Sequence, residues 1–166
     1  MQTPDHIRLI RCWLAIFIIG LTLSSVTAFP LQTELGWLDS LLHSSTLQAI
    51  AKSTGLLPRI ERANEGLRTT NALYPFLAYG MDWLAFAHLI IAVAFIGPYI
   101  DPVRNKWGIT FGLIACAGVI PLALIAGHFR GIPLPRRLID CSFGVVGSAP
   151  LLICRRSILV LERLRD

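Results

Sequence analysis

Residues 107–127, with the sequence WGITFGLIACAGVIPLALIAG, contain no charged side chain. A helix of roughly 20 apolar residues is long enough to cross a hydrocarbon core of about 30 Å. No water is present at that depth, so a spanning segment must satisfy its backbone N–H and C=O groups internally, as a helix does. This stretch therefore predicts a transmembrane helix.

Three further stretches are also predominantly apolar, at residues 7–29, 78–100 and 138–154. The 166-residue chain is 54% hydrophobic and only 15% charged, whereas soluble domains carry about 25% charged residues. The connections between the last three stretches are short, so consecutive helices should be antiparallel neighbours. We predict an all-α integral membrane protein, a four-transmembrane-helix bundle that forms a single membrane domain over residues 1–166.

The first apolar stretch has an alternative interpretation as a signal peptide. Arg8 and Arg11 precede an apolar run, and small residues lead up to Ala28, as at a cleavage site. The run reaches roughly 20 residues, which is longer than the core of a signal peptide and sufficient for a span. A retained helix is therefore favoured, with cleavage after Ala28 as the alternative.

Residues 31–74 form the one long polar stretch. Leucines recur there at helical spacing behind a possible N-cap at Thr33, and Gly55 should end this first helix. Pro58 can open a second, mostly polar helix. We expect two short interfacial helices between spans 1 and 2, whose ordinary role would be to pack against the bundle.

The basic residues lie at the ends of the apolar runs, as expected for contacts with lipid head groups rather than with nucleic acid. Eight of the 15 Lys and Arg residues lie at the amino end, in loop 101–106 and in tail 155–166. The other seven lie in residues 31–74 and 128–137, and the longer of these segments counts for less in orientation. The distribution favours an inner-membrane protein with both termini in the cytoplasm and, in a bacterium, residues 31–74 and 128–137 facing the periplasm.

Ionisable side chains inside the apolar runs cost a few kcal/mol each and so require an explanation. Asp82 and His88 lie in the second span and Asp140 in the fourth. Hairpin topology brings the start of span 2, the end of span 3 and the start of span 4 to the same membrane face. The basic side chains predicted to join them there are His128, Arg130, Arg136 and Arg137.

This grouping predicts a polar, net-positive pocket at the outer face for an anionic group such as a lipid head group. The arginines would hold the anion, and Asp82, His88 and Asp140 would supply any acid/base chemistry. Each residue also has a structural explanation. Asp140 follows Arg136 by four residues, the spacing of a helical ion pair; Asp82 suits a helix start; and His88 can hydrogen-bond across helices.

Cofactor chemistry has little support in the sequence. The cysteines, at positions 12, 116, 141 and 154, form no CxxC pair and no zinc-spaced group with histidine. His88 and His128 fall at different depths, which argues against a haem between them. Four scattered histidines are too few for a di-metal site, so no metal is predicted and the cofactor is left open.

Gly108 and Gly112 form a GxxxG pattern in the third span. Small residues at this spacing let helices approach closely, either within a bundle or between copies. The pattern keeps two alternatives open: a non-catalytic subunit or assembly factor of a larger membrane complex, and an oligomeric transporter or channel. The chain shows no internal repeat or pair of broken helices to support the transporter.

Overall fold

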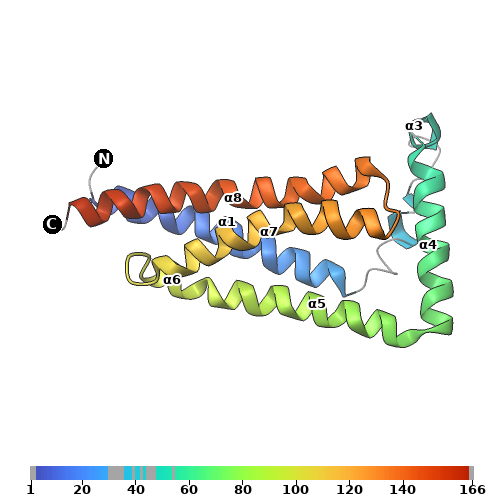
Figure 1. Ribbon diagram of the computed structural model, residues 1–166, viewed down its shortest axis with the longest axis horizontal. Helices are drawn as coiled ribbons and strands as arrows, with labels where there is room; N and C mark the ends of the chain where they lie inside the picture. Colours follow the sequence, from blue (N-terminus) through green and yellow to red (C-terminus); the bar gives the residue numbers. More distant parts are fainter. Residues whose placement is uncertain are drawn as a thin grey trace. The chain divides into compact units, whose positions relative to one another are not determined.

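A computed structural model describes residues 3–29, 36–38, 40–41, 43, 48–53 and 55–164. Their regular structure is entirely helical, as the sequence predicts (Figure 1). The helices in chain order are α1 (Thr3–Ala28), α3 (Gln48–Ser53), α4 (Leu56–Leu73), α5 (Pro75–Ala94), α6 (Ile96–Ile100), α7 (Lys106–Phe129) and α8 (Leu134–Arg163). The chain forms two compact units, and each is described by itself. Unit 1 comprises Met1–Leu21 and Ile91–Asp166, and unit 2 comprises Thr22–Ile90.

Four helical segments in the described residues are long and apolar enough to cross a membrane. They are Asp5–Ala28, Pro75–Ile100, Lys106–Phe129 and Leu134–Arg163. Many of their large apolar side chains are exposed, for example Phe129 at 84% and Val146 at 70%. Such exposure is expected where the surrounding solvent is lipid. The prediction of an all-α membrane protein with four spans is confirmed.

Helix α8 is longer than the stretch 138–154 predicted from hydropathy. Its 30 residues correspond to about 45 Å, more than the hydrocarbon core requires. Beyond Cys154, Ser157, Ile158 and Leu161 continue the buried face, while Arg155 points to the exposed side. The helix therefore continues because one face remains packed after the other becomes charged.

The second span is interrupted near its end. Proline has no N–H to donate, so Pro98 leaves the carbonyl group four residues earlier without its helical partner. Helix α5 ends at Ala94 and α6 begins at Ile96. Between them, the Phe95 N–H donates to the oxygens of both Ile91 and Ala92 at 3.2 Å. The break turns Phe95 into the interior of unit 1, where its side chain is 2% exposed.

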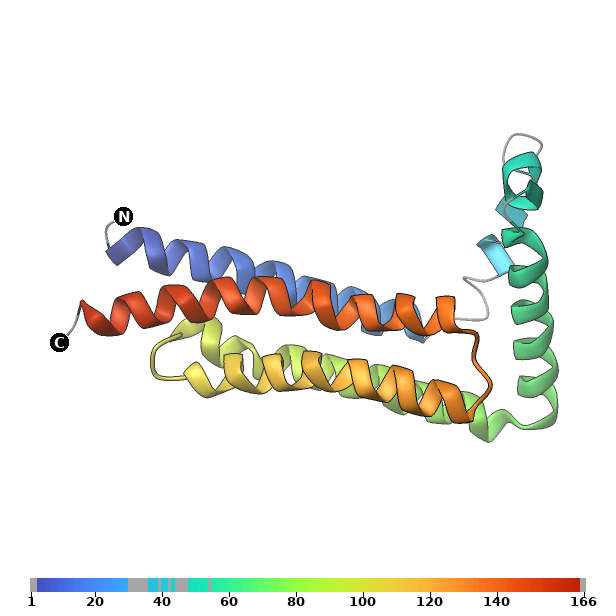
Figure 2. The ribbon, with the colours of Figure 1, turned by 45° about the horizontal axis from the view of Figure 1, so that its top comes forward.

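The core of unit 1 joins α1, α7, α8 and the α5–α6 junction. Helices α7 and α8 lie side by side and antiparallel (Figures 1 and 2). The rings of Phe17 and Phe95 meet at 4.8 Å. The buried side chains of this core are Ile10, Leu14, Phe95, Ile109, Leu151, Cys154, Ile158 and Leu161. In lipid, where the solvent is itself apolar, close packing of this kind stabilises helix association more than hydrophobic transfer does.

Glycines mediate the closest helix contacts in unit 1. A Cβ at Gly108 would lie 2.6 Å from Pro98 Cγ, and one at Gly112 would lie 2.6 Å from Phe95 Cζ. A Cβ at Gly144 would lie 2.5 Å from the backbone oxygen of Cys116. The GxxxG pattern thus serves packing within the chain, and association between copies through the same glycines stays a prediction.

Arg11 ties α1 to the end of α6 in unit 1. Its Nε and Nη2 donate to the carbonyl oxygens of Tyr99 and Ile100, each at 3.3 Å. A cation at this position also complements the negative end of a helix dipole. On the same unit, Lys106 Nζ lies 2.7 Å from Glu162 Oε1 and links α7 to α8.

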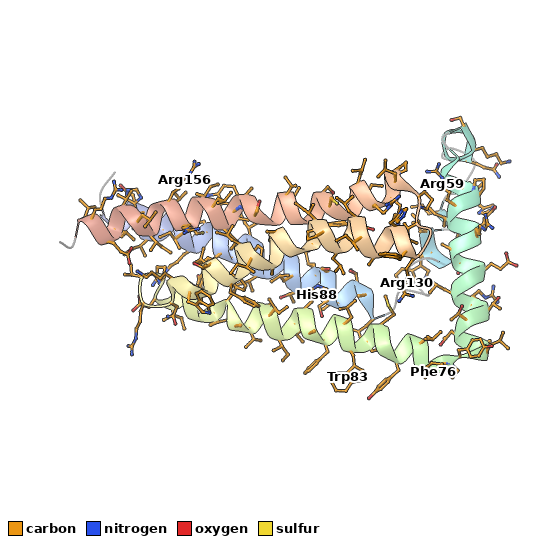
Figure 3. The ribbon with its side chains drawn as sticks, in the orientation of Figure 1. Arg59, Phe76, Trp83, His88, Arg130 and Arg156 are labelled. Atoms are coloured by element: carbon orange, nitrogen blue, oxygen red, sulfur yellow. The ribbon has the colours of Figure 1, made fainter. Side chains whose placement is uncertain are left out.

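Unit 2 contains the polar stretch and most of α5. Gly55 separates α3 from α4 with φ of 65°, a left-handed conformation that favours glycine, and this agrees with the predicted helix end. The Thr33 N-cap lies outside the described residues. Phe76 and Trp83 project outward from α5 (Figure 3), and the Trp83 ring makes edge contacts with Tyr79 and Phe86. Such an aromatic group is typical of a membrane–water interface.

Candidate functional site

The turn between α7 and α8 has a defined backbone geometry. Gly131 has φ of 66°, its N–H donates to His128 O at 3.0 Å, and the Ile132 N–H donates to Gly127 O at 2.8 Å. This pair of bonds is a Schellman motif, which satisfies the last carbonyl groups of a helix. The turn fixes Arg130 as the C-terminal cap of α7. Sequence reasoning missed this motif, although Gly131 followed two residues later by Pro133 is a recognisable signal for it.

We expect Gly131→Ala to lower the free energy of unfolding by about 1 kcal/mol, because an L side chain at positive φ is strained. SDS-induced unfolding of the purified protein in mixed micelles would measure the change. Gly20→Ala is the matched control, since Gly20 lies within α1 and an added Cβ there meets nothing within 4 Å. Equal stability of the two variants would contradict the assigned turn.

The three arginines at this turn have different environments. Arg136 Nε lies 3.6 Å from Asp140 Oδ1, the i,i+4 ion pair that the sequence spacing indicated. Arg137 Nη1 donates to Leu124 O at 3.3 Å, and its stem packs so closely on Gly127 that a Cβ there would lie 2.6 Å from Arg137 Cδ. Arg137 Nε is buried without an acceptor among the described residues. The Arg130 guanidinium makes no hydrogen bond or ion pair within the described part of the chain.

The electrostatics of the turn are positive. Three arginines less one aspartate give a net charge of +2. Cations are favourable next to the C-terminus of a helix, where the dipole is negative, so Arg137 and Arg130 also stabilise the end of α7. Arg136 and Arg137 are thus engaged within the protein, whereas the Arg130 guanidinium makes no such contact among the described residues.

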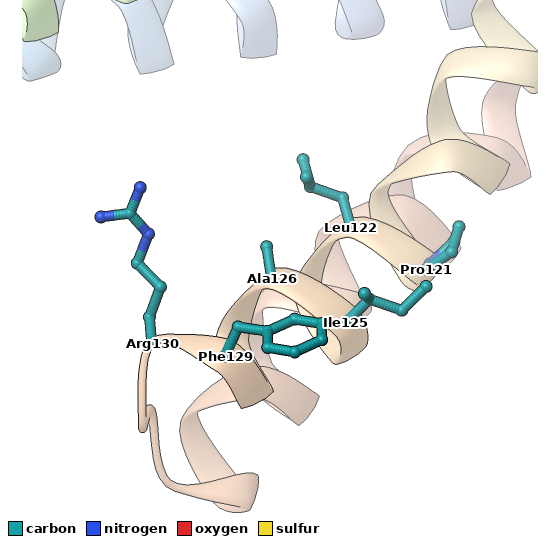
Figure 4. Close-up of a pocket in the computed structure, with 6 residues that line it drawn as sticks. All are labelled: Pro121, Leu122, Ile125, Ala126, Phe129 and Arg130. Atoms are coloured by element: carbon teal, nitrogen blue, oxygen red, sulfur yellow. The ribbon is translucent and has the colours of Figure 1, made fainter.

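Two shallow, largely apolar grooves lie along α7, and Arg130 lines both of them. The first groove has a volume of about 460 Å³ and is lined by Pro121, Leu122, Ile125, Ala126, Phe129 and Arg130 (Figure 4). The second groove has a volume of about 330 Å³ and is lined by Val119, Leu122, Ala123, Ala126, Gly127, Arg130, Ile132 and Asp140. Both grooves share Leu122, Ala126 and Arg130, which we call the ridge. Figure 4 shows these three side chains on the same side of α7.

Of the predicted site residues in unit 1, two line a groove. Arg130 lines both grooves and Asp140 lines the second. His128 lines neither groove; its ring contacts that of Phe129 at 5.9 Å. Arg136 lines neither groove, but it forms an ion pair with Asp140 of the second groove.

Asp82 and His88 lie on α5 in unit 2, and both are partly buried. Near them the Ser25 hydroxyl, which is fully buried, donates to Ala85 O at 2.6 Å. Helices α1 and α5 run antiparallel past this hydrogen bond. Thr22, three residues before Ser25, therefore lies at about the same height along the helices as His88, three residues after Ala85. Sequence reasoning missed Ser25, although a polar side chain inside an apolar run was the available signal. The approach of Asp82 and His88 to the α7–α8 turn stays a prediction, because they belong to the other unit.

No group of three or more His, Cys, Asp or Glu side chains suited to a metal ion occurs in the part of the chain that the structure describes. The thiols of Cys12, Cys116, Cys141 and Cys154 are all free. At the α7–α8 turn, the Arg130 guanidinium lines the two largely apolar grooves, the second of which also contains Asp140.

Comparison with known proteins gives no relative from which a role could be transferred. No protein-family model, curated protein or solved structure matches this chain.

Proposed function

We propose that this membrane protein binds the anionic head group of a membrane lipid at the α7–α8 turn. The observation that carries the proposal is the Arg130 guanidinium, which has no partner among the described residues and lines two largely apolar grooves. A guanidinium presents paired donors that match the oxygens of a phosphate group. Apolar surface directly below the cation suits the acyl part of the same molecule.

The surroundings of Arg130 support an anion rather than a cation. The net charge of +2 at the turn raises the local positive potential, and the Arg136 ion pair offsets the charge of Asp140. Asp82, His88 and Asp140 remain the predicted acid and base groups of this proposal. Asp140 is the one among them that lines a groove together with Arg130.

The proposal includes an orientation in the membrane. An even number of spans returns both termini to one side, and the excess of basic residues near the termini favours the cytoplasm for that side. In a bacterial inner membrane, the α7–α8 turn and its lipid site would then lie at the periplasmic face.

We expect Arg130→Gln to reduce binding of phosphatidylglycerol about tenfold relative to phosphatidylcholine of the same chain length, because a charge-assisted contact is lost. Native mass spectrometry of the protein in detergent, titrated with each lipid, would measure the ratio. Glutamine keeps part of the side-chain length and its hydrogen-bonding capacity but removes the charge.

Arg156→Gln is the matched control, because Arg156 is an exposed arginine of α8 far along the helix from the turn (Figure 3). This control should keep the lipid preference of the unmodified protein. An unchanged preference in Arg130→Gln, or an equal loss in both variants, would count against the proposal.

A further inference from the structure

We infer that the occupant of this site is a phospholipid with two acyl chains, which straddles the ridge with its phosphate at Arg130 and one chain in each groove. The inference rests on the proposed function for the phosphate contact. It adds the shape of the ligand, which the charge of Arg130 alone does not specify.

The spacing of the lining residues carries the inference. Leu122, Ala126 and Arg130 are separated by four residues each and therefore form one row on the surface of α7. Pro121, Ile125 and Phe129 follow the same spacing on one side of this row. Val119, Ala123 and Gly127 follow it on the other side. Two nearly parallel apolar grooves thus flank a single ridge.

The depth of the grooves fits one leaflet of a bilayer. From Leu122 to Arg130 the helix rises about 12 Å, close to half of a hydrocarbon core of about 30 Å. The charged end of the ridge is at the turn, where a head group would lie. Acyl chains that extended from there toward Pro121 and Val119 would reach about the middle of the membrane.

The distribution of charge fits the same ligand. Arg130 is the one charged side chain in the first groove, and the second adds only Asp140, which is paired with Arg136. A phosphodiester therefore has its cation on the ridge that both grooves share, and the remaining lining residues are apolar except for the paired Asp140. A free phosphate would contact only the Arg130 guanidinium. A single-chain lipid would fill one groove and leave the other groove empty.

The test compares three probes by native mass spectrometry: phosphatidylglycerol, lysophosphatidylglycerol and inorganic phosphate. We expect the two-chain lipid to bind about threefold more tightly than the single-chain lipid, a modest factor because chain packing replaces contacts with detergent. Equal binding of the two lipids, both dependent on Arg130, would overturn this inference and leave the proposed function intact. Lipid binding that does not depend on Arg130 would overturn both this inference and the proposed function. Inorganic phosphate that binds as tightly as the lipids would also overturn both.

A variant that fills one groove tests the contribution of each acyl chain to binding separately. Ala123→Phe places a ring in the second groove and should remove the advantage of the two-chain lipid while leaving single-chain binding unchanged. Ala117→Phe is the matched control, since Ala117 is exposed on the same helix and lines neither groove. If Ala123→Phe fails to fold, Ile125→Trp fills the first groove from an exposed position. A two-chain advantage that persists in the folded variant would overturn the inference.

Discussion

Gly144→Leu is expected to lower the free energy of unfolding by about 3 kcal/mol, because a side chain forced into a tight helix contact displaces its surroundings. An ideal Cβ at this position lies 2.5 Å from the carbonyl oxygen of Cys116 and 3.4 Å from Val119 Cβ. The first of these atoms belongs to the backbone of α7, so no rotation of a side chain relieves the clash. SDS-induced unfolding in mixed micelles would measure the loss.

The same substitution should also weaken lipid binding, since α7 and the beginning of α8 together line the second groove. Gly118→Leu provides the control. Gly118 is an exposed residue of α7, and a Cβ added there meets nothing within 4 Å. Its stability should stay within about 0.5 kcal/mol of the unmodified protein. A similar loss in both variants would mean that α7 and α8 do not approach each other at Gly144.

The four spans could be predicted from the sequence because a bilayer restricts the possible structures so strongly. An apolar run of sufficient length has few alternatives to a helix in lipid. Local rules also succeeded where they depend on neighbours in the chain, as for the Arg136–Asp140 pair at i,i+4. Gly55, with its left-handed backbone, ends its helix for a similarly local reason.

The end of α8 was harder to predict because hydropathy averages over both faces of a helix. Arg155 and Arg156 lower that average and suggest the end of a span. The structure keeps them on the exposed side while Ser157 and Ile158 remain buried. Only the packing of α8 on its neighbours, which is not encoded by local composition, reveals that the helix continues to Arg163.

The candidate site shows the same limit. Sequence reasoning grouped Arg130, Arg136 and Arg137 as equivalent ligands for an anion. Their roles separate only when the turn geometry is known, because Arg137 reaches back to Leu124 and Arg136 pairs within α8. The depth of each arginine in the membrane can be predicted from its position in a span. The partner of each guanidinium cannot, because it depends on the path of the backbone through Gly131.

Phe95→Ala is expected to cost about 3 kcal/mol, the usual result of removing a large buried aromatic side chain. Phe95 is 2% exposed, its ring lies 4.8 Å from that of Phe17, and its Cζ faces Gly112. The loss would therefore affect the contacts of α1, α7 and the α5–α6 junction at once. Phe143→Ala is the control, because Phe143 is 68% exposed on α8, and it should change stability by less than about 0.5 kcal/mol.

A double substitution shows whether the cost comes from the contact between Phe95 and Gly112. Gly112→Ala alone should be destabilising, because its methyl group would lie 2.6 Å from Phe95 Cζ and 2.7 Å from Leu151 Cδ1. In the Phe95→Ala background the first of these clashes is absent, and the added methyl group occupies part of the vacated space. The combined loss of stability should therefore be smaller than the sum of the two single losses, as expected for residues in contact. Strict additivity in the same unfolding titration would show that Phe95 does not fill the space beside Gly112, and that the core of unit 1 is packed differently.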